Sequence, residues 1–261
     1  YKSRGRLPND RWEFYDAAEQ AVRDAWVRYR IRDADRYLPG DYLPELLGHL
    51  ALKGMENGQV IFMRQDLENN ARIILKERGY TGREQDEEIS RFLRAAEDLI
   101  GVLVEQGPER YGFLHLTFQE FYAAKALINR SGDVAQYISQ YWDHPDWSEV
   151  WVLYALKIQN DSSRFAELFQ NILASADPLD QFLHREKITC LVLAGTGGVS
   201  LPEVAIKVLK WAANLLSQKK NDPLFLVFDV LAQWERSLPQ YLIDALLICL
   251  NSDSTEIRRA A

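Results

Sequence analysis

The stretch YGFLHLTFQEFYAAKAL, residues 111–127, predicts a short strand that passes directly into a helix. The strand pattern ends at His115, and apolar residues then recur at helical spacing. Thr117 and Glu120 have the spacing of a capping box, in which the threonine oxygen accepts a backbone N–H and the glutamate bonds back. Free N–H groups and the positive end of a helix dipole then lie beside an imidazole, which suits a phosphate. The alternative is a plain helix start with a hydrogen-bonded histidine.

Two blocks of the sequence resemble signatures of NACHT-type signalling ATPases. The block FLHLTFQEFYAA, residues 113–124, resembles F-x-H-x-[ST]-F-Q-E-[FY]-x-A-A, which lies in the winged-helix domain after the ATPase core. The block LPNDRWEFY, residues 7–15, resembles L-P-x-x-R-x-E-L-Y of the small helical domain, with Phe14 where leucine is usual. Because the two blocks occur in the family's order and spacing, together they are more specific than either alone.

The resemblance implies a role for each matched residue. His115 corresponds to the histidine that contacts the β-phosphate of bound ADP and holds the resting, closed state. The matched structural positions are Leu7, Pro8, Arg11 and Tyr15, and the matched core positions are Phe113, Phe118 and Phe121. We expect Phe118 and Phe121 to point into the seam under the hairpin. Gln119 and Glu120 match positions that we expect to cap the helix and to form hydrogen bonds between domains, with no catalytic role.

The sequence contains no phosphate-binding loop of the form GxxxxGK[ST], so the backbone cradle and the lysine that ATP hydrolysis needs are absent. The glycine cluster at residues 195–198 lacks that lysine and predicts a turn between helices. We therefore expect neither catalysis nor nucleotide binding from this chain alone. The resemblance implies that the intact protein is an ATPase that binds ADP or ATP with Mg²⁺. The chain has no initiating methionine and ends within a helical pattern, so we expect it to be a piece of a longer protein.

The order of patterns predicts a mainly α fold in three parts. Residues 1–40 match the end of the small helical domain, with an amphipathic helix over residues 9–32. Residues 41–130 predict a winged helix with a short β-hairpin. Its expected elements are helices over residues 43–56, 66–78 and 84–103, a brief strand over 59–63, a hairpin of 102–105 with 111–114, and the signature helix.

The third part, residues 131–261, predicts a truncated α-solenoid of HEAT-like helix pairs. Short helical patterns alternate with turns, and equivalent helices recur about every forty residues. The first helices are expected over residues 134–142, 147–159 and 163–175. An irregular helical bundle is the alternative. The tryptophans of this part could form a binding platform, but their helical spacing favours a core.

Composition and charge narrow the class of protein. Hydrophobic residues make up 47% of the 261, enough for a sizeable core, and no run of eighteen apolar residues predicts a membrane span. Cys190 and Cys249 lie in apolar helical patterns, which predicts buried thiols in a reducing cytoplasm. Isolated histidines and the lack of C-x-x-C pairs predict no metal site.

We do not expect this winged helix to bind nucleic acid. The formal net charge is −7, and basic residues such as Arg72 and Arg83 alternate with Glu68 and Glu84. Such mixing is typical of a solvated surface, whereas a DNA-binding face is basic.

The resemblance implies a regulatory part of a NACHT-type ATPase, in which the winged helix clamps ADP in the resting state. The helical repeats would take a protein or ligand trigger, and the activated protein would self-oligomerise, in antiviral defence or innate immunity. Two alternatives stay open: a HEAT-repeat interaction scaffold without nucleotide switching, and a winged-helix regulator that binds nucleic acid.

Overall fold

The computed structural model divides the chain into two compact units, Tyr1–Asn129 and Arg130–Ala261. It describes residues 10–29, 42–98, 102–130 and 134–176, together with residue 8 and six isolated residues after 176. Across these ranges the chain forms eight α-helices and one three-stranded antiparallel sheet, which confirms the mainly α fold. The predicted HEAT-like repeats after residue 176, Leu7, both cysteines and the glycine cluster lie outside the described residues.

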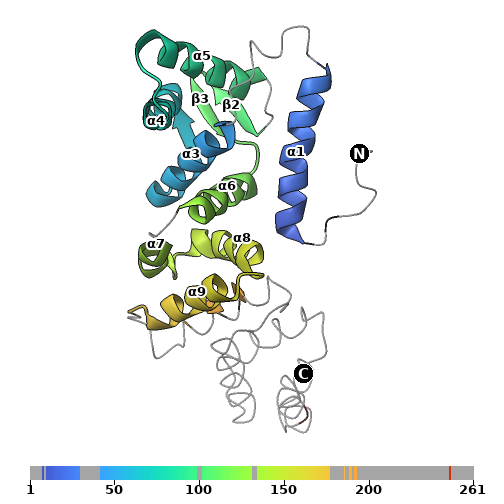
Figure 1. Cartoon of the computed structure of the whole chain (residues 1–261), viewed down its shortest axis with the longest axis vertical. Helices are drawn as coiled ribbons and strands as arrows, with labels where there is room; N and C mark the ends of the chain where they lie inside the picture. Colours follow the sequence, from blue (N-terminus) through green and yellow to red (C-terminus); the bar gives the residue numbers. More distant parts are fainter. Residues whose placement is uncertain are drawn as a thin grey trace. The chain divides into compact units, whose positions relative to one another are not determined.

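The first unit has the element order of a winged helix (Figure 1). Its elements are α1 (Arg11–Tyr29), α3 (Leu43–Asn57), β1 (Ile61–Met63), α4 (Arg64–Glu77), α5 (Gly82–Asp98), β2 (Leu103–Gly107), β3 (Arg110–Phe113) and α6 (Leu116–Asn129). The central strand is β3, which pairs antiparallel with β1 on one side and with β2 on the other. The predicted order of helices, brief strand and hairpin is therefore confirmed.

One predicted boundary is wrong. The helix expected to reach Leu103 is described only to Asp98, and Leu103 instead opens β2, where it pairs with Phe113. Cross-strand pairing on a half-buried sheet outweighs the helical pattern there. The hairpin turn that follows places Glu109 at a φ of 56°. Its carbonyl accepts the Arg64 backbone N–H at 2.8 Å, which ties the hairpin tip to the start of α4.

The core of this unit lies between α3, α6 and the sheet. Gly48 of α3 lies so close to α6 that a Cβ there would meet the Ala126 Cβ at 3.2 Å and the Tyr122 carbonyl oxygen at 3.3 Å. Phe113, on β3, packs against Phe62 of β1 and Tyr122 of α6, with ring centroids 6.1 and 6.0 Å apart. Phe113 thus takes the core position that the resemblance implied.

The second unit begins with a short helical array. Its described elements are α7 (Val134–Tyr141), the 3₁₀ turn η1 (Pro145–Trp147), α8 (Ser148–Ile158) and α9 (Ser162–Ala174). These confirm the three expected helices to within a few residues at each end. Trp147 stacks on Tyr141 at 4.3 Å and on Trp151 at 5.5 Å, and both tryptophans are fully buried. They form the core of this array and not an exposed binding platform.

Two kinds of feature are absent from the described residues. None of the helices there has the length and hydropathy that crossing a bilayer requires. No cluster of three or more histidine, cysteine or acidic side chains there could hold a metal ion.

Candidate functional site

His115 is the exposed residue that joins β3 to α6 and caps the helix. Its carbonyl accepts the Phe118 backbone N–H at 3.0 Å, and its side-chain Nδ1 accepts the Thr117 backbone N–H at 3.3 Å. The Thr117 hydroxyl lies 3.0 Å from the same nitrogen. A capping side chain of this kind satisfies N–H groups that the first turn of a helix leaves without partners.

The predicted capping box is therefore wrong in its register. The helix begins at Leu116, so Thr117 is its second residue and cannot act as the cap. The imidazole of His115 takes the capping role that the threonine oxygen was expected to fill, and the N–H that it accepts is that of Thr117 itself. Glu120, the other half of the expected box, is 8% exposed and lies in the second turn of the helix.

The cap determines the chemistry that His115 presents to solvent. In a neutral imidazole one ring nitrogen accepts and the other carries the proton. Because Nδ1 accepts the Thr117 N–H, the proton belongs on Nε2, which becomes a donor. Within the described part of the chain Nε2 has no hydrogen-bond partner. An N–H donor on an exposed side chain thus lies beside the positive end of a 14-residue helix, where an anionic oxygen is favoured.

Gln119 anchors α6 within the winged helix. Its side chain is 2% exposed, and its Nε2 donates to the Gln59 carbonyl at 2.8 Å in the turn between α3 and β1. Gly54 makes this approach possible, because a Cβ there would lie 2.5 Å from the Gln119 Nε2. The described bond lies inside one domain, whereas the resemblance had implied a bond between domains.

Rings from the two sequence blocks meet where α1 docks on α6. Trp12, which is 6% exposed, packs against Phe121 with centroids 4.9 Å apart. Tyr15 packs against Phe121 at 5.6 Å and against Phe118 at 5.7 Å. The expectation that both phenylalanines face the seam under the hairpin is wrong, since these contacts turn them toward α1. Phe121 is fully buried, whereas Phe118 is only half-buried.

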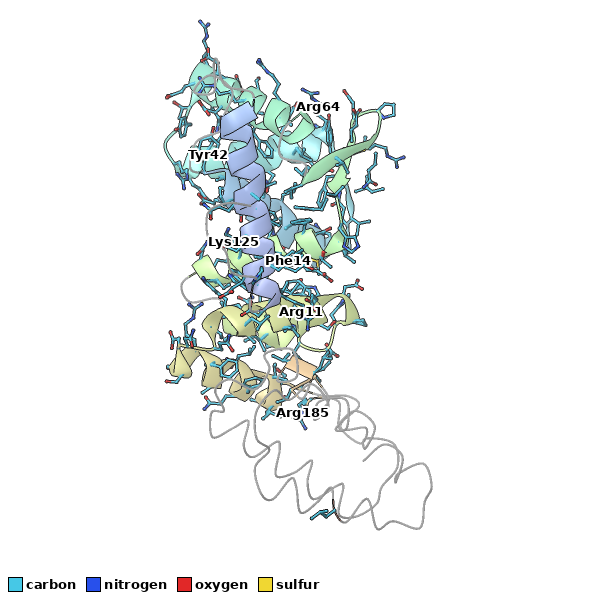
Figure 2. All side chains as sticks on the ribbon, turned by 90° about the vertical axis from the view of Figure 1, so that its right-hand side faces the viewer. Arg11, Phe14, Tyr42, Arg64, Lys125 and Arg185 are labelled. Atoms are coloured by element: carbon cyan, nitrogen blue, oxygen red, sulfur yellow. The ribbon has the colours of Figure 1, made fainter. Side chains whose placement is uncertain are left out.

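An ion pair closes the same interface. Lys125 of α6 lies beside α1 (Figure 2). Its nitrogen is 2.5 Å from the Glu19 carboxylate and 3.8 Å from that of Asp16. Glu19 is 6% exposed, and the lysine nitrogen lies 5.4 Å from the centroid of the Phe121 ring. We name the set Trp12, Tyr15, Glu19, Phe118, Phe121 and Lys125 the α1–α6 seam.

The resemblance gave a role to only half of the residues of this seam. Trp12, Glu19 and Lys125 fell outside the implied functional positions. A usable signal was present, because residues 12, 15 and 19 and residues 118, 121 and 125 share steps of three and four, which place each trio on one helix face. Of the other implied positions, Pro8 is half-buried and Arg11 is exposed.

Two exposed apolar residues flank His115 in the chain, and a third precedes β1. Leu114 and Leu116, its two neighbours in the chain, are 57% and 47% exposed. Val60, the residue before β1, is 53% exposed, and the antiparallel pairing of Ile61 with Gly112 places it near the end of β3. Apolar side chains gathered at one place on a surface mark sites of interaction.

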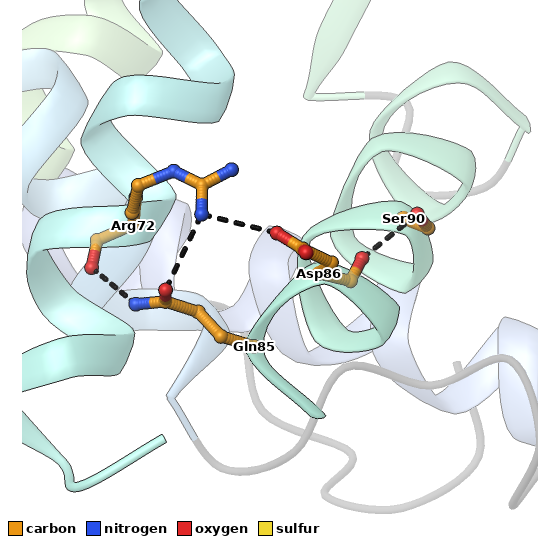
Figure 3. Close-up of polar contacts among 4 residues, drawn as sticks. All are labelled: Arg72, Gln85, Asp86 and Ser90. Atoms are coloured by element: carbon orange, nitrogen blue, oxygen red, sulfur yellow. Dashed lines mark hydrogen bonds and ion pairs between the residues drawn. The ribbon is translucent and has the colours of Figure 1, made fainter. Parts of the chain in front are cut away.

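The helix–turn–helix of this domain is held by polar contacts that neutralise its basic residues. Arg72 of α4 lies 3.0 Å from Asp86 of α5, and the Gln85 amide donates to the Arg72 carbonyl at 2.9 Å (Figure 3). Arg83 is paired with Glu87 at 2.9 Å. In a DNA-binding helix–turn–helix, the second helix enters the major groove. The exposed charged side chains described on α5 are Arg83, Glu84, Asp86, Glu87 and Arg94.

Comparison with known families agrees with this geometry. Residues 40–127 match the winged helix-turn-helix domain C-terminal to NACHT. No curated protein and no solved structure matches the chain. The match runs from just before α3 into the last turns of α6 and includes His115. Over residues 40–127, the chain therefore carries a winged helix-turn-helix domain of the type found C-terminal to NACHT domains.

Proposed function

We propose that this chain is the regulatory part of a NACHT-type signalling ATPase, in which His115 contacts the β-phosphate of ADP and holds a resting, closed state. The capping geometry of His115 carries this proposal. Because Nδ1 is used in the cap, the exposed side chain offers an Nε2–H donor at the positive end of α6. We infer that the anion is a nucleotide because the winged helix is of the type found C-terminal to NACHT domains.

The surroundings of His115 support a docking surface for the nucleotide-binding core. Leu114, Leu116 and Val60 are each about half exposed; the two leucines flank His115 in the chain, and Val60 lies near the end of β3. A core that holds ADP or ATP with Mg²⁺ would cover these side chains in the closed state and leave the phosphate against His115. Burial of apolar area and one charge-assisted hydrogen bond would then act together.

The proposed mechanism is a shift between two populations. Bound ADP favours the closed state because His115 contacts it only there. Exchange for ATP, or capture of a protein or small ligand by the helical second unit, favours the open state. The open protein would then self-assemble through its ATPase core. We place this switch in the cytoplasm, in antiviral defence or innate-immune signalling.

The charge of α5 does not favour nucleic acid as the partner. Three acidic and two basic side chains are exposed over its described part, and Arg83 is already paired. A surface that binds the phosphates of DNA needs unpaired cations, so we expect this domain to bind DNA weakly and without a steep salt dependence. A fluorescence titration with duplex DNA at two salt concentrations tests this. Tight binding with a steep salt slope would make the nucleic-acid regulator the better proposal.

Nucleotide retention by the intact, full-length protein tests the main proposal. His115→Ala removes a hydrogen bond to a charged group, worth about 1.5–3 kcal/mol, so ADP release should accelerate about ten- to hundredfold. His49→Ala is the matched control. That imidazole contacts Asn70 on α4 and lies half-buried in the same domain.

The two variants separate switching from folding. The proposal expects lowered ADP content and self-assembly without trigger for His115→Ala, with normal retention for His49→Ala. Equal ADP release from both variants and the natural protein would favour the scaffold without nucleotide switching.

A further inference from the structure

Tyr15 is linked to His115 through one intervening residue, Phe118. Its ring packs edge-on against Phe118, with centroids 5.7 Å apart. The Phe118 backbone N–H donates to the His115 carbonyl at 3.0 Å. Phe118 is therefore both the third residue of α6 and a side chain that α1 holds. The cap at His115 and the docking of α1 share this one residue.

The first turn of α6 needs such support. The opening N–H groups of a helix have no partner within it, and helix ends fray. Phe118 is only half-buried, so the core alone does not fix its ring. Tyr15 also packs against Phe121 at 5.6 Å, and Phe121 is fully buried in the second turn. The tyrosine ring thus joins the exposed first turn to a part of the helix that cannot move easily.

We infer that Tyr15 is a positioning residue for His115. By holding Phe118 against α1, it keeps the first turn of α6 in the conformation in which the His115 Nδ1 caps the helix and Nε2 carries the proton. Rotation of Phe118 away from this position would loosen both backbone bonds of the cap. The consequence for nucleotide rests on the function proposed above: displacing α1 weakens ADP retention, and bound ADP strengthens α1 docking by the same factor.

Amide hydrogen exchange in the chain itself tests the positioning step. In Tyr15→Ala, the Thr117 and Phe118 amides should exchange about tenfold faster, because opening of the first turn costs less. Tyr15→Phe keeps the ring and should restore the natural rate. Tyr80→Ala is the control, since Tyr80 is also half-buried but packs against Tyr42, the residue before α3.

The outcomes decide the positioning claim. Faster exchange confined to the first turn in Tyr15→Ala, and absent in Tyr15→Phe and Tyr80→Ala, supports it. Unchanged exchange in Tyr15→Ala overturns it, as does an equal acceleration in Tyr80→Ala. If Tyr15→Ala does not fold, Phe118→Leu removes the same ring contact and leaves both amides measurable.

ADP release from variants of the intact, full-length protein then separates this inference from the function on which it rests. Tyr15→Ala should release ADP faster, and it should add little in a His115→Ala background because both changes act through one contact. If His115→Ala accelerates release and Tyr15→Ala does not, the coupling is wrong and the proposed function stands. If neither variant changes release, the proposed function is wrong, and the exchange data still judge the positioning claim.

Discussion

The two sides of α6 are packed in opposite ways. Toward α3 the helices approach closely, since a Cβ on Gly48 would meet the Ala126 Cβ at 3.2 Å, which is tighter than an ordinary contact. Toward α1 the contact consists of rings and an ion pair, with Trp12 against Phe121 and Glu19 beside Lys125. On the far side of α1, Phe14 is 53% exposed.

The difference shows how one helix can serve both the fold and a switch. Close backbone packing has one good arrangement, because interiors are packed as densely as organic crystals. Rings and charges at an edge can separate and then be hydrated, at a cost that salt and ligands change. We interpret the α3 side as the part that holds the winged helix together and the α1–α6 seam as the part that can be released.

The largest expected effect comes from the residue at the centre of the seam. Phe121 is fully buried, so Phe121→Ala should lower the free energy of unfolding by about 3–5 kcal/mol. Phe118 is half-buried, and Phe118→Ala should cost only about 1–2 kcal/mol because less apolar area is lost. Chemical denaturation of both variants measures the two losses. Equal losses of unfolding free energy in the two variants would mean that Phe121 and Phe118 are not a buried centre and a more exposed edge of the seam.

The α3 side should be sensitive to a single added methyl group. In Gly54→Ala the new Cβ would lie 2.5 Å from the Gln119 Nε2 and 2.8 Å from the Gln59 carbonyl oxygen. We expect a loss of about 1–3 kcal/mol from this overpacking. Gly48→Ala, on the same helix, meets its neighbours only at 3.2 Å and should cost less.

Both glycine variants gain the same helix propensity, so their difference in unfolding free energy isolates the clash. Thermal or chemical denaturation provides the comparison. A Gly54→Ala protein as stable as Gly48→Ala would show that the Gln119 contact yields without cost.

The ion pair should contribute less, and its contribution should depend on salt. Glu19→Gln leaves Lys125 beside an uncharged amide, and we expect a loss of about 1–2 kcal/mol because the lysine is partly exposed. Lys125→Met and the double variant complete a cycle that measures the coupling between the two side chains. High salt should reduce this coupling and leave the glycine variants unaffected. A coupling that does not change with salt would contradict the interpretation that the α1–α6 seam can be released.

The smallest expected effect concerns the cap. Thr117 is inside the helix, so Thr117→Ala should lower stability by less than about 0.5 kcal/mol, since only the contact with the His115 Nδ1 is lost. His115→Ala removes the capping nitrogen itself and should cost about 1 kcal/mol. Denaturation curves of the two variants decide which residue is the cap. A larger loss for Thr117→Ala would restore the expected capping box.

Local patterns predicted most elements of the described fold because their causes are local. Apolar spacing defines α3 to α6, and the Gly107–Pro108 turn defines the hairpin. The errors arose where a distant partner decides. Leu103 joins a strand because Phe113 lies opposite, and Phe121 faces α1 because Trp12, more than a hundred residues earlier, supplies a ring. The cap was misplaced because an imidazole can replace a hydroxyl as the acceptor.

The central claim is that His115 caps α6 through Nδ1 and thereby presents an Nε2–H donor. The nitrogen-15 chemical shifts of its imidazole measure this directly in the chain, at a pH where the ring is neutral. The two ring nitrogens differ strongly in shift according to which one carries the proton, and His115→Ala identifies the signals. The account predicts a protonated Nε2 and an accepting Nδ1. A ring protonated on Nδ1, or an even mixture of both tautomers, would contradict it.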